Sequence, residues 1–139
     1  MEKKDHFRLE LITPKRVILD RDVRFVVVPS AQGPLGILPG HAPVLGNLAI
    51  GVLAVRDISQ KEFSAFVDKG FFMISREGVT ITVENAELGP NIDIEKARED
   101  KEHARKIAAS LEAGKQQEEA RDDLLRADAR IKASQATVQ

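Results

Sequence analysis

Histidine, the side chain that most often serves as a metal ligand or general base, occurs three times in this sequence, at positions that are far apart. No histidine stands at a spacing that is typical of a metal site. Cysteine is absent, which excludes disulfides, thiolate nucleophiles and cysteine-ligated zinc. The histidines are His6, His41 and His103. We therefore expect neither a metal site nor a catalytic residue.

Two further patterns match parts of known sites but lack the residues that would complete them. Gly33, Gly36 and Gly40 form a glycine-rich segment, but the Gly-Lys-Ser/Thr end of a phosphate-binding loop does not follow them. Glu84 and Glu87 are two carboxylates near the end of an expected strand, where a solvated pair is the simpler interpretation. The chain by itself is therefore predicted not to be an enzyme.

Residues 33–45 combine a stiff backbone with apolar side chains. The segment reads Gly-Pro-Leu-Gly-Ile-Leu-Pro-Gly-His-Ala-Pro-Val-Leu, with three glycines and three prolines. Proline fixes φ and glycine reaches conformations that other residues avoid, so the loop should hold one shape. Exposed connections are normally polar, so an apolar one favours contact with a protein or membrane surface. The alternative is a tight turn at Gly40-His41-Ala42-Pro43, in which His41 bonds its own backbone.

The elements that must hold these residues begin with β-strands. Apolar and polar residues alternate at 7–11, 63–67 and 79–83, and 25–28 is a continuous apolar run expected to be buried on both faces. Short strands separated by turn residues predict a flattened β-sandwich or barrel. We place this domain at residues 1–88.

The composition changes at Leu88-Gly89-Pro90-Asn91, where a strand should end and a helix should follow. Residues 89–139 are rich in Ala, Glu, Lys, Arg, Asp and Gln, which predicts an antiparallel two-helix hairpin. Asp93 is the expected N-cap of its first helix. Gly114 is expected to end that helix in a left-handed conformation.

The expected seam of the hairpin is mostly alanine. Its residues are Ala97, Ala104, Ile107, Ala108 and Leu111 in the first helix and Ala120, Leu124, Ala127 and Ile131 in the second. At about 0.8 kcal/mol per buried CH₂, such a seam is weaker than one of leucines, while both helices keep a high intrinsic propensity. Two interpretations stay open: a hairpin that opens as a switch, and a static hairpin docked on the sandwich.

Val28-Pro29 followed by residues 33–43 resembles the signature of the epsilon subunit of bacterial F-type ATP synthases. Lys69-Gly70-Phe71-Phe72-Met73-Ile74 is similar to that family's Gly-Gly-Phe-x-x-Val strand, with lysine in place of the first glycine. Residues 79–83 followed by Ala86-Glu87 are similar to its last strand. The resemblance extends over the whole chain, including the helical hairpin.

The resemblance implies two docking surfaces on the sandwich. One face would bind the γ subunit, and the 33–45 loop would contact the ring of membrane-embedded c subunits. The implied c-ring docking residues are Gly33, Leu35, Gly36, Ile37, Leu38, Pro39, Gly40, His41, Ala42, Pro43 and Val44. The chain would then be a non-catalytic central-stalk subunit that passes rotation of the proton-driven ring to γ.

The start of the first helix resembles the family's nucleotide motif, Ile/Leu-Asp-x-x-Arg-Ala. The candidate ATP-binding residues are Ile92, Asp93, Lys96, Ala97, Arg126 and Arg130. Lys96 departs from the motif, because lysine lacks the bidentate fork of the guanidinium group. The alternative is that Asp93 is only an N-cap and the basic side chains form a solvated helix face. No cofactor is required, and regulatory Mg-ATP is the one ligand that the resemblance implies.

The same helix has a second implied partner. In this family the extended C-terminal helix enters the α/β catalytic head, contacts an acidic segment of the β subunit and inhibits ATP hydrolysis. The candidate β-subunit contacts are Arg121, Arg126, Arg130 and Lys132. Intervening aspartates dilute this basic face, so inhibition is expected to be mild.

The overall composition is compatible with this interpretation. The formal net charge is −1, so no global field would attract nucleic acid, and no apolar run reaches the roughly 20 residues of a bilayer span. We expect a soluble chain without a targeting segment, held peripherally at the cytoplasmic face of the bacterial plasma (inner) membrane. The competing hypothesis is a free-standing ATP-sensing regulatory module.

Overall fold

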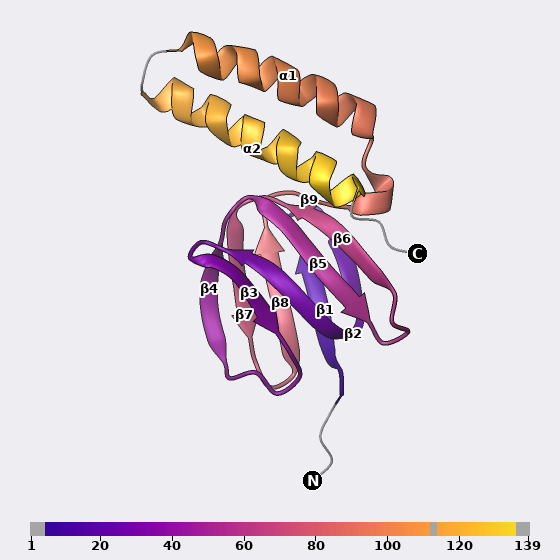
Figure 1. The fold of residues 1–139 in the computed structure, drawn as a ribbon. Coiled ribbons are helices and arrows are strands. Elements are labelled where there is room, and N and C mark those ends of the chain that lie inside the picture. Colours follow the sequence, from indigo (N-terminus) through magenta and orange to yellow (C-terminus); the bar gives the residue numbers. More distant parts are fainter. Residues whose placement is uncertain (1–4, 112–113, 136–139) are drawn as a thin grey trace.

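A computed structural model describes residues 5–111 and 114–135 of the chain. The outer ends of the two predicted domains and positions 112–113 lie outside the described residues. Nine strands precede a short 3-10 helix and two α-helices, and the helices lie together at one end of the β-domain (Figure 1). The strands are β1 (Phe7–Ile12), β2 (Val17–Ser30), β3 (Gly33–Ile37), β4 (Val44–Leu48), β5 (Gly51–Asp57), β6 (Glu62–Val67), β7 (Gly70–Ile74), β8 (Gly78–Val83) and β9 (Ala86–Leu88).

The strands form one sheet that folds over on itself. Its order is β1-β8-β7-β4-β2-β5-β6-β9, with β3 paired to β2 and a further pairing of β1 with β2. The long strand β2 pairs with β1 through its first half and with β3 and β5 through its second half, so it belongs to both layers. Only the β1–β8 pairing is parallel among the described strands. The predicted flattened sandwich or barrel is confirmed.

The alternation read from the sequence places the core correctly in most strands. Leu9 and Leu11 of β1 and Ile81 of β8 are fully buried, as the period of two predicts. The expectation that residues 25–28 are buried on both faces is wrong, because only Val26 and Val28 of that run belong to the core.

Strand β6 is covered on both sides. Ala65 and Val67 face the core of the sandwich, while Phe66 packs with apolar residues of the helical segment. Ser64, on the same side as Phe66, is also buried. The helical segment packs against the outer side of this strand, which is therefore shielded from solvent on that side too.

The C-terminal segment contains η1 (Gly89–Asn91), α1 (Ile94–Ser110) and α2 (Lys115–Gln135). Asp93 is the N-cap of α1, since its Oδ1 accepts a hydrogen bond from the Lys96 amide at 3.1 Å. The expectation that Gly114 ends α1 is wrong, because α1 already ends at Ser110 and Leu111 is extended. Gly114 instead precedes α2, where its carbonyl oxygen accepts the Glu118 amide hydrogen at 3.0 Å.

The two helices are stacked on the sandwich in order, with α2 against the β-domain and α1 on the far side of α2 (Figure 1). The predicted alanine seam is confirmed at Ala97, Ala104, Ala120 and Ala127, which are all buried. Another face of α2 buries Ala129 and Ala133 in a cluster with Phe66, Ile92 and Ala97. The hairpin is therefore docked through α2, and α2 would have to leave both the sandwich and α1 if it were to extend.

Candidate functional site

The first half of the predicted docking loop is a strand. Residues Gly33–Ile37 form β3, which pairs antiparallel with the end of β2 after a turn at residues 31–32. Ile37 is 1% exposed and belongs to the core, so the prediction that it is a docking residue at the surface is wrong. This strand is not predicted from the sequence, because glycine and proline are typical of loops. One of its glycines, Gly36, packs closely against a neighbouring side chain. A Cβ atom on Gly36 would lie 3.3 Å from the ring of Phe25.

The exposed part of the segment is a tight turn from Leu38 to His41. The His41 amide donates to the Leu38 carbonyl oxygen at 3.2 Å, and Gly40 between them has φ +82°. Pro39 followed by a glycine with positive φ is the pattern of a type II turn. The His41 ring nitrogen Nδ1 lies at hydrogen-bond distance, 2.8 Å, from the Ala42 carbonyl oxygen. The chain therefore does turn tightly next to His41, but over residues 38–41 and not over the predicted 40–43.

Exposed apolar side chains occur at this turn and on strands β4 and β7. Leu38 is 59% exposed and Leu45 is 72% exposed. Leu45 pairs with Met73 of β7, and Phe71 lies two residues from Met73 on the same side of that strand. Phe71 and Met73 are each nearly half exposed. We call Leu45, Phe71 and Met73 the apolar face.

The predicted docking residues include Leu38 and Val44 but not Phe71 or Met73. The signal was present, because Phe71-Phe72-Met73-Ile74 is a run of four apolar residues. In a strand, such a run must point two side chains away from the core that receives the other two. Here Phe72 and Ile74 are buried and the other two are exposed.

The candidate nucleotide residues at the start of α1 serve the fold. Ile92 and Ala97 are buried in the cluster between the helices and the sandwich. Asp93 is engaged as the N-cap, and Lys96 is exposed on the surface. These four side chains therefore do not converge on one free site.

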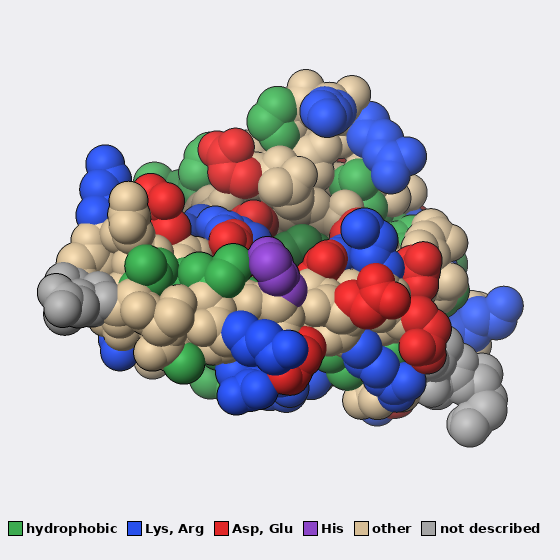
Figure 2. Space-filling model, turned by 90° about the horizontal axis from the view of Figure 1, so that it is seen from above, with side chains coloured by type: hydrophobic (Ala, Val, Ile, Leu, Met, Phe, Trp, Pro, Cys, Tyr) green, Lys and Arg blue, Asp and Glu red, His purple; other side chains and the backbone are tan. Residues whose placement is uncertain are grey.

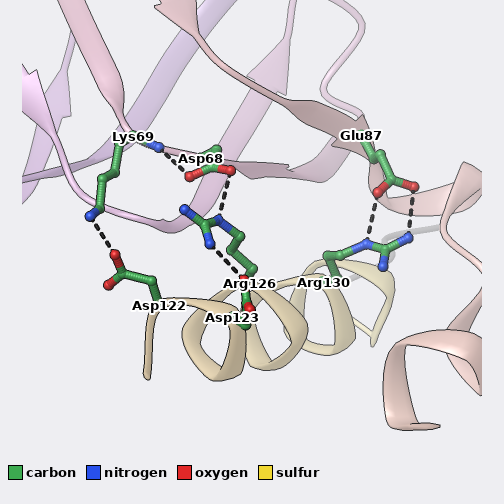
Figure 3. Close-up of polar contacts among 7 residues, drawn as sticks. All are labelled: Asp68, Lys69, Glu87, Asp122, Asp123, Arg126 and Arg130. Atoms are coloured by element: carbon green, nitrogen blue, oxygen red, sulfur yellow. Dashed lines mark hydrogen bonds and ion pairs between the residues drawn. The ribbon is translucent and has the colours of Figure 1, made fainter. Parts of the chain in front are cut away.

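The two candidate arginines of α2 point toward the sandwich and meet carboxylates there (Figure 3). Arg126 Nε donates to Asp68 Oδ2 at 2.8 Å, and its Nη1 donates to Asp123 at 2.8 Å. Burial by itself would lower the pKa of Arg126, but the hydrogen bonds and charges of Asp68 and Asp123 outweigh burial, and the pKa is raised. This side chain therefore stays fully charged.

Arg130, one helical turn further along α2, also meets carboxylates, and its Nη2 donates a hydrogen bond to Glu87 Oε2 at 3.3 Å. Its Nε lies 2.7 Å from Glu87 Oε1, and its Nη1 lies 3.5 Å from Asp100 Oδ2 of α1. It thus links the sandwich, α2 and α1. Both arginines are already neutralised by carboxylates of the chain itself.

A cavity of about 350 Å³ lies between the hairpin and the sandwich. Its apolar wall includes Phe66, Ala104 and Ala127, and its polar wall includes Arg126 and Arg130. Of the six candidate ATP-binding residues, these two arginines line the cavity. The structure therefore brings together one part of the predicted nucleotide site and leaves the 92–97 part elsewhere.

The remaining candidate β-subunit contacts are exposed on α2. Arg121 and Lys132 both lie at the surface, and Lys132 Nζ pairs with Asp128 at 3.0 Å. Seen from the hairpin side, acidic and basic side chains are intermixed over the surface (Figure 2). No broad basic patch is formed on that face.

The described part of the chain contains no group of three or more histidine, cysteine or acidic residues that could hold a metal ion. Among its described helices, none is long and apolar enough to cross a membrane.

Comparison with known proteins gives matches over nearly the whole chain. The family model described as ATP synthase, Delta/Epsilon chain, beta-sandwich domain matches residues 6–89. A protein named ATP synthase epsilon chain from Nitratidesulfovibrio vulgaris is 37% identical over 132 residues, which cover 95% of this chain and 96% of the relative. The epsilon chain of Moorella thermoacetica is 38% identical over 128 residues, with 92% and 96% covered.

Solved structures show the same fold at lower identity. A chain in the Euglena gracilis mitochondrial ATP synthase, OSCP/F1/c-ring structure superposes with a TM-score of 0.80 at 24% identity, covering 93% of this chain and 81% of that chain. A chain in the central stalk/c-ring structure of the Tetrahymena thermophila mitochondrial ATP synthase gives a TM-score of 0.64 at 17% identity, covering 96% and 99%.

Proposed function

The chain belongs to the ATP synthase epsilon-chain family, and from this premise we propose that it is a central-stalk subunit that couples c-ring rotation to ATP synthesis through γ. The chemistry of ATP synthesis takes place on other subunits of such a complex. This chain supplies a docking surface and a helical hairpin that regulates the motor.

The observation that carries the proposal is the apolar surface at one end and side of a closed β-domain. Leu38 and Leu45 are among the most exposed large apolar residues that the structure describes. Both are held by rigid elements, a proline-glycine turn and a paired strand. Exposed apolar side chains on a stiff scaffold suit a permanent protein interface, because little conformational entropy is lost when it forms.

The two parts of this surface fit two partners. The turn at Leu38–His41, with its exposed Leu38 side chain, would meet the c-ring. The apolar face of Leu45, Phe71 and Met73 is a broad sheet surface, which would pack on γ. Through these contacts the chain would be held peripherally at the cytoplasmic face of the membrane, next to a proton-driven ring.

The hairpin is proposed to inhibit ATP hydrolysis when it extends. Arg126 and Arg130 are engaged by Asp68 and Glu87 in the docked state. They would become available to acidic residues of the β subunit only after α2 leaves the sandwich. Arg121 and Lys132, which are exposed already, would lengthen the same contact.

Regulatory ATP is a second proposal, and the cavity beside Arg126 and Arg130 is the observation that favours it. Its apolar wall would accept a flat base, and its guanidinium groups would attract phosphates. The phosphates would have to displace Asp68 or Glu87, so we expect weak binding. A free-standing ATP sensor would use the same cavity but would have no need for the exposed apolar surface.

Co-expression with the cognate γ subunit and c subunits tests the main proposal. Purification of the chain by an affinity tag should bring down γ and, in detergent, the c-ring. Isolation of the chain alone under these conditions, while a hairpin response to ATP persists, would favour the sensor.

A further inference from the structure

The turn between β6 and β7 carries two opposite charges that face α2. Asp68 is 4% exposed through its side chain, and Lys69 follows it directly. Asp68 Oδ1 accepts the hydrogen of the Lys69 backbone amide at 2.8 Å, which fixes the carboxylate in place. Its other oxygen, Oδ2, accepts from Arg126 Nε at 2.8 Å.

The neighbouring lysine makes the complementary contact. Lys69 Nζ donates to Asp122 Oδ2 at 2.6 Å (Figure 3). Asp122 and Arg126 are four residues apart, so they lie one above the other on the same side of α2. The negative Asp68 of the sandwich thus faces the positive Arg126 of the helix, and the positive Lys69 faces the negative Asp122. We call these four residues the charge clamp.

The alternation of signs fixes the position of α2 along its axis. If α2 moved by one turn in one direction, Asp122 would lie against Asp68. Movement by one turn the other way would bring Arg126 against Lys69. Each shift turns one of the two attractions into a like-charge contact, which is costly where Asp122 meets the buried Asp68 and mild where Arg126 meets the exposed Lys69. Glu118 or Arg130, one turn further along α2, would then face the other charge of the sandwich, so each shift loses one attraction and keeps the other.

The two pairs of the clamp differ in burial and therefore in strength. Lys69 is largely exposed, so its pair with Asp122 is weak and salt-sensitive. Asp68 is buried when α2 is docked, so in that state it needs a countercharge. Arg126 supplies it.

We propose that the charge clamp keeps the hairpin of this chain closed and in register without any ligand, with Asp68 occupying the guanidinium group that a phosphate would otherwise engage. The inference rests on the proposed regulatory function of the hairpin and specifies its resting state. Release of α2 then requires that a competing carboxylate or phosphate replace Asp68 at Arg126.

The test measures docking of α2 in the full isolated chain. Because the chain has no cysteine, cysteines introduced at Ile58 and Leu125 are the only labelling sites. Both residues are exposed, the first in the β5–β6 turn and the second on α2. Spin labels there report the distance between α2 and the sandwich, so an extended helix appears as a second distance even if it stays helical.

In the labelled chain with the charge clamp intact, we expect a single distance between the two spin labels in the absence of nucleotide. Arg126→Met should raise the extended population by a factor of about 100 or more, because it leaves Asp68 buried without its countercharge. Adding Asp68→Asn to that variant should restore much of the docked population. Glu62→Gln, which removes the exposed Arg56–Glu62 pair away from α2, is the matched control and should change nothing.

Reversing the charges of the exposed Lys69–Asp122 pair tests the position of α2 along its axis and leaves the buried Asp68–Arg126 pair unchanged. Lys69→Asp and Asp122→Lys should each broaden or shift the distance, and the two together should restore it. A single unchanged distance in Arg126→Met, or two distances in the parent chain without ligand, would overturn the clamp. Co-purification with γ is measured separately on the same variants, so loss of the clamp and loss of the stalk assignment are distinguished.

Discussion

The backbone of Gly89 lies against the carbonyl oxygen of Ala133, so closely that a side chain at residue 89 has no room. Gly89 begins the 3-10 turn that leads from the sandwich to α1, and Ala133 is in the last turns of α2. The end of the hairpin is therefore anchored at the point where it leaves the β-domain.

Gly89→Ala should displace the end of α2 from the sandwich. The new methyl group would clash with rigid backbone, an overpacking cost of about 1–3 kcal/mol. Spin-label distances between α2 and the sandwich should broaden while the β-domain keeps its fold. Gly36→Ala is the control, since its added methyl group meets the movable ring of Phe25. An unchanged distance in Gly89→Ala would show that the close approach does not hold α2.

The hairpin should loosen in acid. The pKa of Asp128 lies below its ordinary value of 3.8, because Lys101 of α1 and Lys132 donate hydrogen bonds to its carboxylate. A depressed pKa in the folded state gives stability that is present above the ordinary value and is lost as the pH falls through the lower one. Asp128→Asn should therefore weaken closure at pH 6, whereas the difference from the parent chain should shrink as the pH falls below 3.8 and vanish once the pH is below the lowered pKa of Asp128. A difference that persists in strong acid would assign the effect to packing.

Mg-ATP titrated calorimetrically into the isolated chain should bind weakly, in the millimolar range, which corresponds to about −4 kcal/mol. The phosphates must compete with Asp68 and Glu87 for the arginines, which accounts for the low affinity. The paired Arg126→Ala and Arg130→Ala substitutions should abolish the heat. Equal binding by that variant would place ATP elsewhere, and absence of heat in the parent chain would leave the arginines with structural roles alone.

The β-domain was largely predictable because local alternation decides which face of a strand is buried. Leu9, Leu11 and Ile81 needed no knowledge of their neighbours. Strand β3 was hidden because its glycine and proline residues are typical of loops, and only its pairing with β2 makes it a strand. Residues 25–28 were misjudged because a run of apolar residues does not reveal which neighbours cover each face.

The contacts of the hairpin could not be read from its helices. Asp68 and Arg126 are 58 residues apart, and no local pattern links them. The sequence suggests solvated or ligand-binding arginines on α2, whereas in the closed hairpin carboxylates of three other segments, the β6–β7 turn, β9 and α1, reach them. In the sequence, Lys69 is only a departure from the family pattern. Its ion pair with Asp122 of α2 becomes evident only when the structure places the two side chains opposite each other.

Leu38→Asp should weaken association with the c-ring and leave the fold intact. The side chain is exposed, so a carboxylate there costs no core packing, but it would be desolvated at an interface. Retention of the variant with purified c-ring in detergent measures the effect, together with the melting temperature of the isolated chain. Val44→Asp, at a less exposed position at the start of β4, should act in the same direction. If either variant melts well below the parent, that residue contributes to the core and not to docking.

The central claim, that this chain docks γ through its apolar face, is tested most directly by the affinity of the purified chain for its cognate γ subunit. Leu45→Asp and Met73→Asp should each weaken binding by about 100-fold, as expected for central apolar contacts of an interface. Ile58→Asp, an equally drastic change at an exposed apolar residue of the β5–β6 turn, should leave the affinity unchanged. Wild-type affinity in both face variants, or equal loss in Ile58→Asp, would contradict this assignment.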